Sequence, residues 1–151
     1  MRARNLSAAV GVFLVSIGAG CAGLEVDADG LPYRLKLREG NTYFGNTLVI
    51  TEVKGDSREY RPGATYLVRG RYILRSHQEA VLMQWCADGW VQEVDSEDPE
   101  PRCGGSLRVK RGKGEFSFRF KVKEVGELHL SFYPVGGGES FASLYYTITT
   151  E

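Results

Sequence analysis

The sequence predicts an all-β domain, built as an antiparallel sandwich or barrel of about eight or nine strands. The 151 residues include 19 Gly, 8 Tyr and 7 Phe, a composition that favours strands joined by tight turns. Short segments of alternating apolar and polar side chains recur every 8–12 residues or so, with turn signals between them, as in sandwiches and barrels. No segment shows a convincing helical period.

The first half of the domain contains four predicted strands. Residues 31–37 alternate apolar and charged side chains, which buries one face of a strand and exposes the other. Residues 47–53 are β-branched and apolar, and residues 65–74 alternate again. Gly70 lies within that third strand and predicts a bulge or a closely packed neighbour. Residues 80–86 are apolar on both faces, which indicates a central strand.

The second half begins with a hairpin turn at Asp88-Gly89 and includes an acidic loop. Residues 95–105 contain acidic residues, Pro and Gly without apolar periodicity, so we expect a loop there. Residues 116–122 show the clearest alternation in the chain, with three Phe on one face. The predicted strands of this half are 90–94, a short one beginning at 107, 116–122, 128–132 and 141–149.

Residues 1–20 are predicted to be an export signal. Arg2 and Arg4 precede an uncharged stretch, and small residues precede Cys21. Removing residues 1–20 takes away two of the 19 basic residues and none of the 19 acidic ones, which leaves a net charge of −2. The alternative is an uncleaved membrane anchor, because residues 5–24 carry no charge. Residues 21–30 are small and acidic and are predicted to be a tether before a domain at 31–151.

The segment Gly18-Ala19-Gly20-Cys21 resembles the bacterial lipobox. The resemblance implies that Cys21 is lipidated and becomes the mature N-terminus at the bacterial cell envelope. Gly18 departs from the pattern, which has a branched aliphatic residue at that position. The alternative is ordinary signal cleavage with Cys21 unmodified, and either way the folded domain is expected outside the cytoplasm.

Two further segments resemble secreted bacterial immunoglobulin-like domains, many of them uncharacterised. They are Tyr60-Arg-Pro-Gly-Ala-Thr-Tyr-Leu-Val-Arg-Gly70 and Gly126-Glu-Leu-His-Leu-Ser-Phe-Tyr-Pro-Val-Gly-Gly-Gly138. The resemblance covers residues 60–148 and rests on turn and core positions. It implies an immunoglobulin-like sandwich and transfers no catalytic residue.

Cys86 and Cys103 are predicted to form a disulfide, because an even pair in an oxidising compartment is most simply a bridge. The bridge would close a short loop and stabilise the fold by roughly 3 kcal/mol. A metal or redox site is disfavoured, since the chain has no Cys-x-x-Cys and neither His77 nor His129 stands at ligand spacing from a cysteine.

Three groups of side chains are candidates for binding. The acidic loop 88–100 offers oxygen ligands for calcium at Asp95, Glu97, Asp98 and Glu100, although without EF-hand spacing. A basic group suits an anionic glycan, a lipid headgroup or a protein, or is a solvated strand face; its members are Arg108, Lys110, Arg111, Lys113, Arg119, Lys121 and Lys123. Aromatic side chains can stack on sugars or belong to the core, and the candidates are Trp85, Trp90, Tyr133 and Tyr145.

The sequence therefore predicts an exported and lipid-anchored envelope module that binds a protein or a glycan, or has a structural role. The alternative is a periplasmic or extracellular protein that binds a small ligand or calcium through the acidic loop. We expect no enzyme and no cofactor, because no nucleophile–base pair or Gly-x-Ser-x-Gly motif occurs. His77 and His129 are accordingly expected to be surface or partly buried side chains. The balanced charge argues against a nucleic-acid partner.

Overall fold

A computed structural model describes residues 31–32, 34–37, 43–86, 89–97 and 102–149. The predicted signal segment 1–20, the tether 21–30 and Cys21 lie outside these residues. The described part is all strand, turn and loop, with no helix, which confirms the all-β prediction. Its residues include no helix that is long and apolar enough to cross a membrane.

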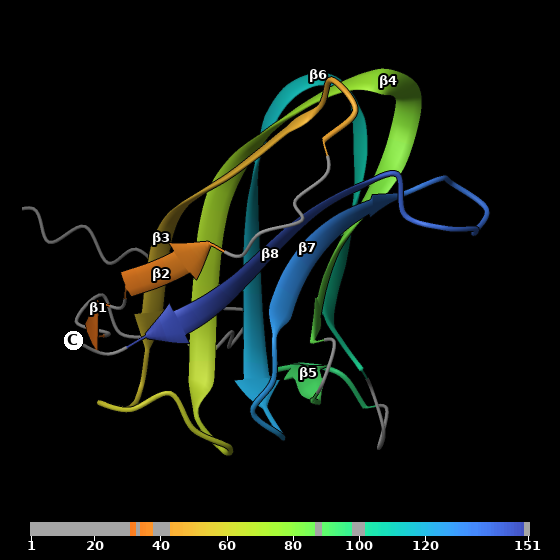
Figure 1. Cartoon of the computed structure of the whole chain (residues 1–151). Coiled ribbons are helices and arrows are strands. Elements are labelled where there is room, and N and C mark those ends of the chain that lie inside the picture. Colours follow the sequence, from red (N-terminus) through yellow and green to blue (C-terminus); the bar gives the residue numbers. More distant parts are fainter. Residues whose placement is uncertain (1–30, 33, 38–42, 87–88, 98–101, 150–151) are drawn as a thin grey trace, which may run out of the picture.

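Eight strands make up the described part of the chain, and every pairing between them is antiparallel (Figure 1). They are β1 (Leu31–Pro32), β2 (Arg34–Leu37), β3 (Thr47–Gly55), β4 (Thr65–Cys86), β5 (Val91–Glu93), β6 (Cys103–Val122), β7 (Leu128–Tyr133) and β8 (Ala142–Thr149). The segments 65–74 and 80–86, predicted as two strands, are parts of the single strand β4. The predicted loop 95–105 ends earlier than expected, because β6 already begins at Cys103.

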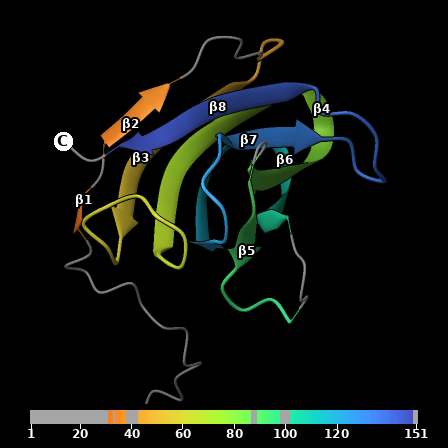
Figure 2. The same cartoon turned by 60° about the horizontal axis from the view of Figure 1, so that its bottom comes forward.

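Strands β4 and β6 are long and pair along almost their whole length, from Thr65↔Lys121 to Trp85↔Cys103. The free edge of β4 is shared, with β3 beside its first half and β7 beside its second half. Both strands bend, so that their two halves belong to two layers of strands facing each other (Figures 1 and 2). One layer contains β1, β3 and β5, and the other contains β2, β7 and β8.

A bulge in β4 produces the bend. Leu74 pairs with Gly112 and Glu79 with Lys110, so the four residues 75–78 stand opposite Arg111 alone. Extra residues on one strand interrupt the hydrogen-bond ladder, bend the strand and increase its twist. The polar segment around His77 is therefore the corner of one continuous strand and does not link two strands.

The buried side chain of Asn46 braces this corner. Its Oδ1 accepts hydrogen bonds from the backbone N–H groups of Arg75 (2.8 Å) and Ser76 (3.1 Å), and its Nδ2 donates to Ser76 Oγ (3.0 Å). Asn46 is itself positioned by a tight turn, in which its N–H donates to the Tyr43 carbonyl over 2.7 Å. The side-chain amide of Asn46 thus provides the hydrogen-bond acceptor that these backbone N–H groups would otherwise find on the neighbouring strand.

The core lies between the two layers and fills with large side chains. Phe116, Phe118 and Phe120 of β6 are buried, as the alternation predicts. Two glycines allow close packing against these rings. A Cβ on Gly104 would lie 2.8 Å from Phe120 Cβ, and one on Gly70 would lie 2.4 Å from Phe116 Cζ. The close packing predicted at Gly70 is therefore present.

Two tyrosine hydroxyls anchor the strands to each other and to a loop. The Tyr146 hydroxyl of β8 donates a hydrogen bond to Gln84 Oε1 of β4 over 2.6 Å, and both side chains are fully buried. The buried amide oxygen of Gln84 therefore has a hydrogen-bond partner. Tyr66 is also fully buried, and its hydroxyl donates to the Glu59 carbonyl (2.9 Å) and accepts from the Arg61 N–H (3.3 Å). A buried polar group lowers the stability of the fold unless it has a hydrogen-bond partner, and these bonds supply one.

Strand β3 has a bulge of its own. Its register with β4 shifts between Ile50 and Glu52, and its other edge pairs with β1 only at Lys54 and Gly55 within the described residues.

The brace at the corner generates a first prediction. Replacing Asn46 by Ala should lower the free energy of unfolding by about 2–3 kcal/mol, because two backbone N–H groups lose their acceptor. Urea denaturation followed by tryptophan fluorescence measures the change. Ser76→Ala is the matched control, since it removes one hydroxyl and leaves both backbone bonds to Asn46, so its effect should be clearly smaller. Equal losses in the two variants would contradict the bracing role.

Candidate functional site

An aromatic cluster occupies the outer face of the layer formed by β4, β7 and β8. We call Trp85, His129, Tyr133 and Tyr145 the outer aromatic cluster. The register places Trp85 opposite His129 and His129 opposite Tyr145, in one row across the three strands. All four side chains are partly exposed, whereas their neighbours along the strands, such as Gln84, are buried in the core. The alternation of each strand therefore directs these rings outward.

The rings contact one another in pairs. His129 stacks on Tyr145 with centroids 4.8 Å apart and planes 27° apart. Trp85 meets Tyr133 edge to face, with centroids 6.4 Å apart. Such pairs stabilise one another by about 0.5–1.5 kcal/mol beyond the area they bury. The cluster is thus an ordered surface of four rings.

Two small residues lie between the rings of the cluster. Ser131 and Ser143 are cross-strand partners on the same outward face, two residues from His129 and Tyr145. Their hydroxyls are 2.7 Å apart, and both side chains are buried. Because Ser131 and Ser143 are small and buried, the exposed surface of this face is formed mainly by the flanking aromatic rings.

Two nitrogen atoms of the cluster are buried without a hydrogen-bond partner among the described residues. They are Trp85 Nε1, a donor, and His129 Nδ1. Burial lowers the pKa of His129 to about 4, so its ring is neutral at pH 7. An unsatisfied buried polar group costs about 1–3 kcal/mol of stability.

The predicted disulfide between Cys86 and Cys103 is not seen in the structure. The register places the two side chains apart. Cys103 pairs with Trp85 and not with Cys86, and adjacent residues of a strand point to opposite faces. Cys86 is buried in the core, whereas the Cys103 thiol donates to the Gly105 carbonyl over 3.0 Å. Burial raises the pKa of the Cys103 thiol.

The other predicted candidates do not join the cluster. Of the acidic loop, Asp95 and Glu97 are described, whereas Asp98 and Glu100 lie outside the described residues. No group of three His, Cys, Asp or Glu side chains that could hold a metal occurs within 31–32, 34–37, 43–86, 89–97 and 102–149. Trp90 lies before β5 in the opposite layer, where the Arg102 guanidinium stands 4.5 Å from its ring centroid.

The predicted basic group is divided by the bend of β6. Arg108 and Lys110 lie on the half that pairs with the second half of β4, and Arg108 forms an ion pair with Glu79. Arg119 and Lys121 lie on the other half, in the opposite layer. The bend therefore separates residues that are close in sequence, and they do not form one basic surface.

His77 lies at the corner of β4 instead of in the cluster. Its Nδ1 is 2.8 Å from Ser76 Oγ, and its ring stacks on Phe141 with centroids 3.9 Å apart. Phe141 in turn stacks on the buried Phe132. These contacts give His77 a structural role in covering the end of the core.

The chain matches no known protein family, no curated protein and no solved structure in the comparisons made.

The burial of His129 predicts a pH-dependent stability. An unfolded histidine takes up a proton near pH 6.5, whereas folded His129 does so only near pH 4. Its contribution is therefore present above pH 6.5 and declines as the pH falls to 4, because the unfolded chain binds the proton first. Allowing for its partial exposure, we expect a loss on the order of 2 kcal/mol.

Urea denaturation at pH 7, 5.5 and 4 measures this loss in the wild type and in His129→Phe. The Phe variant keeps an aromatic ring on Tyr145 but cannot titrate, so its stability should fall less over the same range. Parallel curves for the two proteins would contradict the assignment to His129.

Proposed function

We propose that this protein is an exported, non-enzymatic binding module of the bacterial cell envelope, and that its outer aromatic cluster binds a glycan. The observation that supports this most is the gathering of three of the four predicted aromatic candidates, Trp85, Tyr133 and Tyr145, with His129 on one outer face. Partly exposed aromatic rings are typical of binding surfaces, since they combine a large apolar area with a polar atom.

A glycan suits the chemistry of this face better than a charged partner does. Pyranose rings present an apolar C–H face that packs on aromatic rings and a rim of hydroxyls that both donate and accept hydrogen bonds. The cluster presents aromatic rings and, with His129 neutral at pH 7, no charge, whereas Trp85 Nε1 and His129 Nδ1 are buried. Sugars of the β-1,4-linked amino-sugar type have the flat shape that a row of rings across three strands accommodates.

The fold proposed for the module is an immunoglobulin-like sandwich, as the sequence resemblance implies. Two facing layers of antiparallel strands support it. The Tyr66 hydroxyl, which bonds the backbone seven residues upstream at Glu59, also supports it, because a tyrosine near a strand start that holds the preceding backbone is a feature of such sandwiches. In a sandwich, the outer strand faces and the loops can bind partners without disturbing the core.

The export and anchoring of the module rest on its N-terminal sequence. The signal-like segment 1–20 and the lipobox-like residues before Cys21 support a location on the outer side of a membrane, with attachment through a lipid on Cys21. The acidic residues of the tether 21–30 then separate the domain from the membrane surface.

Glycan binding is tested with a soluble β-1,4-linked N-acetylglucosamine hexamer and isothermal titration calorimetry. We expect Trp85→Ala and Tyr133→Ala each to weaken binding at least about tenfold, because each removes a ring from the centre of the surface. Trp90→Ala is the matched control, since Trp90 lies in the other layer against Arg102. No binding by the wild type, or equal weakening by Trp90→Ala, would refute a glycan site at the cluster.

Anchoring is tested by Cys21→Ser, which removes the only atom that the proposed lipid can be attached to in the lipobox-like segment. Cell fractionation and intact mass should show the wild type in the membrane fraction with added acyl mass and the variant without that mass, released from the membrane. Retention of the variant at full precursor length would instead indicate an uncleaved anchor.

A further inference from the structure

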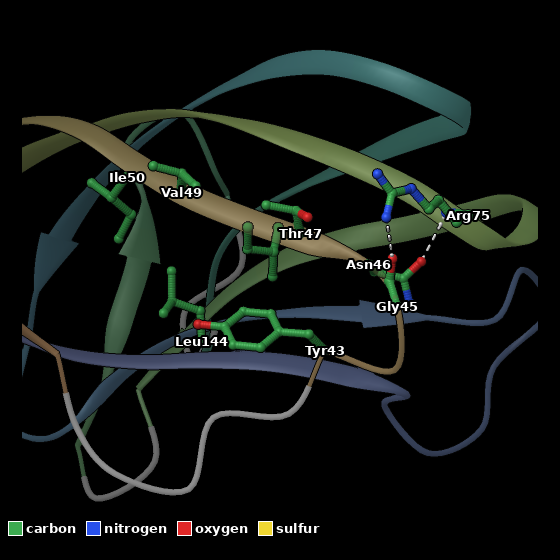
Figure 3. A pocket seen from close by; sticks show the side chains of 9 residues that line it. Tyr43, Gly45, Asn46, Thr47, Val49, Ile50, Arg75 and Leu144 are labelled. Carbon is green, nitrogen blue, oxygen red and sulfur yellow. Dashed lines mark hydrogen bonds between the residues drawn. The ribbon is translucent and has the colours of Figure 1, made fainter.

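A second site, distinct from the outer aromatic cluster, lies where the two layers open between β3 and β8 beside the corner of β4. It is a pocket of about 730 Å³, within the range of roughly 300–1,000 Å³ typical of small-molecule sites. We call it the β3–β8 pocket. Figure 3 shows the side chains around it, and it is lined by Tyr43, Gly45, Asn46, Thr47, Leu48, Val49, Ile50, Arg75 and Leu144.

The floor of the β3–β8 pocket is apolar. Leu48 and Leu144 belong to the buried core, and Ile50 and Tyr43 pack against that core while remaining partly exposed. Figure 3 shows Leu144 and the Tyr43 ring facing β3 from the other side of the pocket. An apolar chain placed here would cover the exposed parts of Ile50 and Tyr43, which is favourable in proportion to the area removed from water, whereas Leu48 and Leu144 are already buried.

The turn before β3 has an unusual backbone conformation. Phe44 lies between the lining residues Tyr43 and Gly45, and its φ of +43° is in the left-handed region, which a bulky non-glycine side chain rarely adopts. Val49 of β3 alternates with Leu48 and Ile50, so its exposed side chain points to the opposite face of the strand from theirs.

Charge at the pocket is of one sign. Arg75 lies at the end formed by the β4 corner, where Asn46 holds its backbone N–H and its guanidinium Nη1 donates to the Gly45 carbonyl over 3.4 Å (Figure 3). The guanidinium forms no ion pair with a carboxylate of the described residues, and none of the described residues that line the pocket is acidic. It is therefore available to an anionic group, for which guanidinium has a suitable hydrogen-bonding geometry.

We propose that the β3–β8 pocket binds a single-chain anionic amphiphile, with its carboxylate at Arg75 and its hydrocarbon chain between β3 and β8. The apolar floor recognises the chain, and Arg75, the one cation among the described lining residues, fixes the direction in which it enters. This site needs neither the glycan site nor the lipid on Cys21.

Octanoate is the probe, with 1-octanol and octyltrimethylammonium as chain-matched neutral and cationic ligands. The full chain carries Cys21→Ser, so that no acyl group of its own competes. Two-dimensional NMR should show octanoate shifting the amide signals of Leu48, Ile50 and Leu144, with weaker shifts from octanol and none from the cation. The outer aromatic cluster should keep its signals unchanged.

Variants at Arg75 separate charge recognition from effects on folding. Arg75→Gln should weaken octanoate binding about tenfold and bring it close to that of octanol, whereas Arg75→Lys should restore part of the preference. Arg71→Gln is the matched control, because Arg71 is exposed on β4 and does not line the pocket. All variants keep the Asn46 bonds to the backbone of residue 75, and their urea midpoints verify folding.

Three results would overturn the proposal. They are equal binding of the three ligands, unchanged octanoate affinity in Arg75→Gln, and octanoate shifts that map to Trp85 and Tyr133. Trp85→Ala should leave octanoate binding intact, so failure of this site and failure of the glycan site are distinguishable.

Discussion

The bulge of β4 at residues 75–78 is the feature on which the rest of the structure depends. Four residues opposite Arg111 alone turn one long strand from the first layer into the second, and β6 follows it. Such a corner exposes backbone groups that have lost their ladder partners, and the buried Asn46 amide supplies acceptors for two of them. The same corner positions both proposed binding surfaces, because it carries β4 into the second layer, where Trp85 lies, and presents Arg75 at the end of the β3–β8 pocket.

The closed side and the open side of the molecule differ in how they are packed. On the closed side, glycine lets the two halves of β6 approach until Gly104 packs against the Phe120 side chain. On the open side, β3 and β8 belong to different layers and are not paired with each other, and Leu48 and Leu144 lie between them at the base of a pocket. The buried hydrogen bond from Tyr146 to Gln84 joins β8 to β4 inside the core.

Much of the fold is predictable from local alternation, and the failures have local causes. The strands around 116–122, 128–132 and 141–149 are predicted correctly, because each buries one face. Residues 75–78 are polar and lack that pattern, so a strand that continues through them resembles a loop in the sequence. The aromatic cluster is only half predictable. Alternation puts His129 and Tyr145 each on a polar face, whereas Trp85 lies in a segment that is apolar on both faces, and only the register between strands brings the three into one row. That no bridge between Cys86 and Cys103 is seen has the same origin, since register and not sequence distance determines which face Cys103 shares.

The long pairing of β4 with β6 also bears on how the chain reaches this structure. The pair closest in sequence is Trp85↔Cys103, and the most distant is Thr65↔Lys121. Loop closure costs least entropy for the nearest ends, so the hairpin forms most readily from the Trp85 end and extends toward the corner. Strand β3 meets the first half of β4 over a still shorter connection, at Gly55↔Tyr66, so this hairpin also closes locally. Strands β3 and β8 are not paired with each other, so the β3–β8 pocket is complete only when β7 and β8 have joined the second half of β4 and brought Leu144 into place.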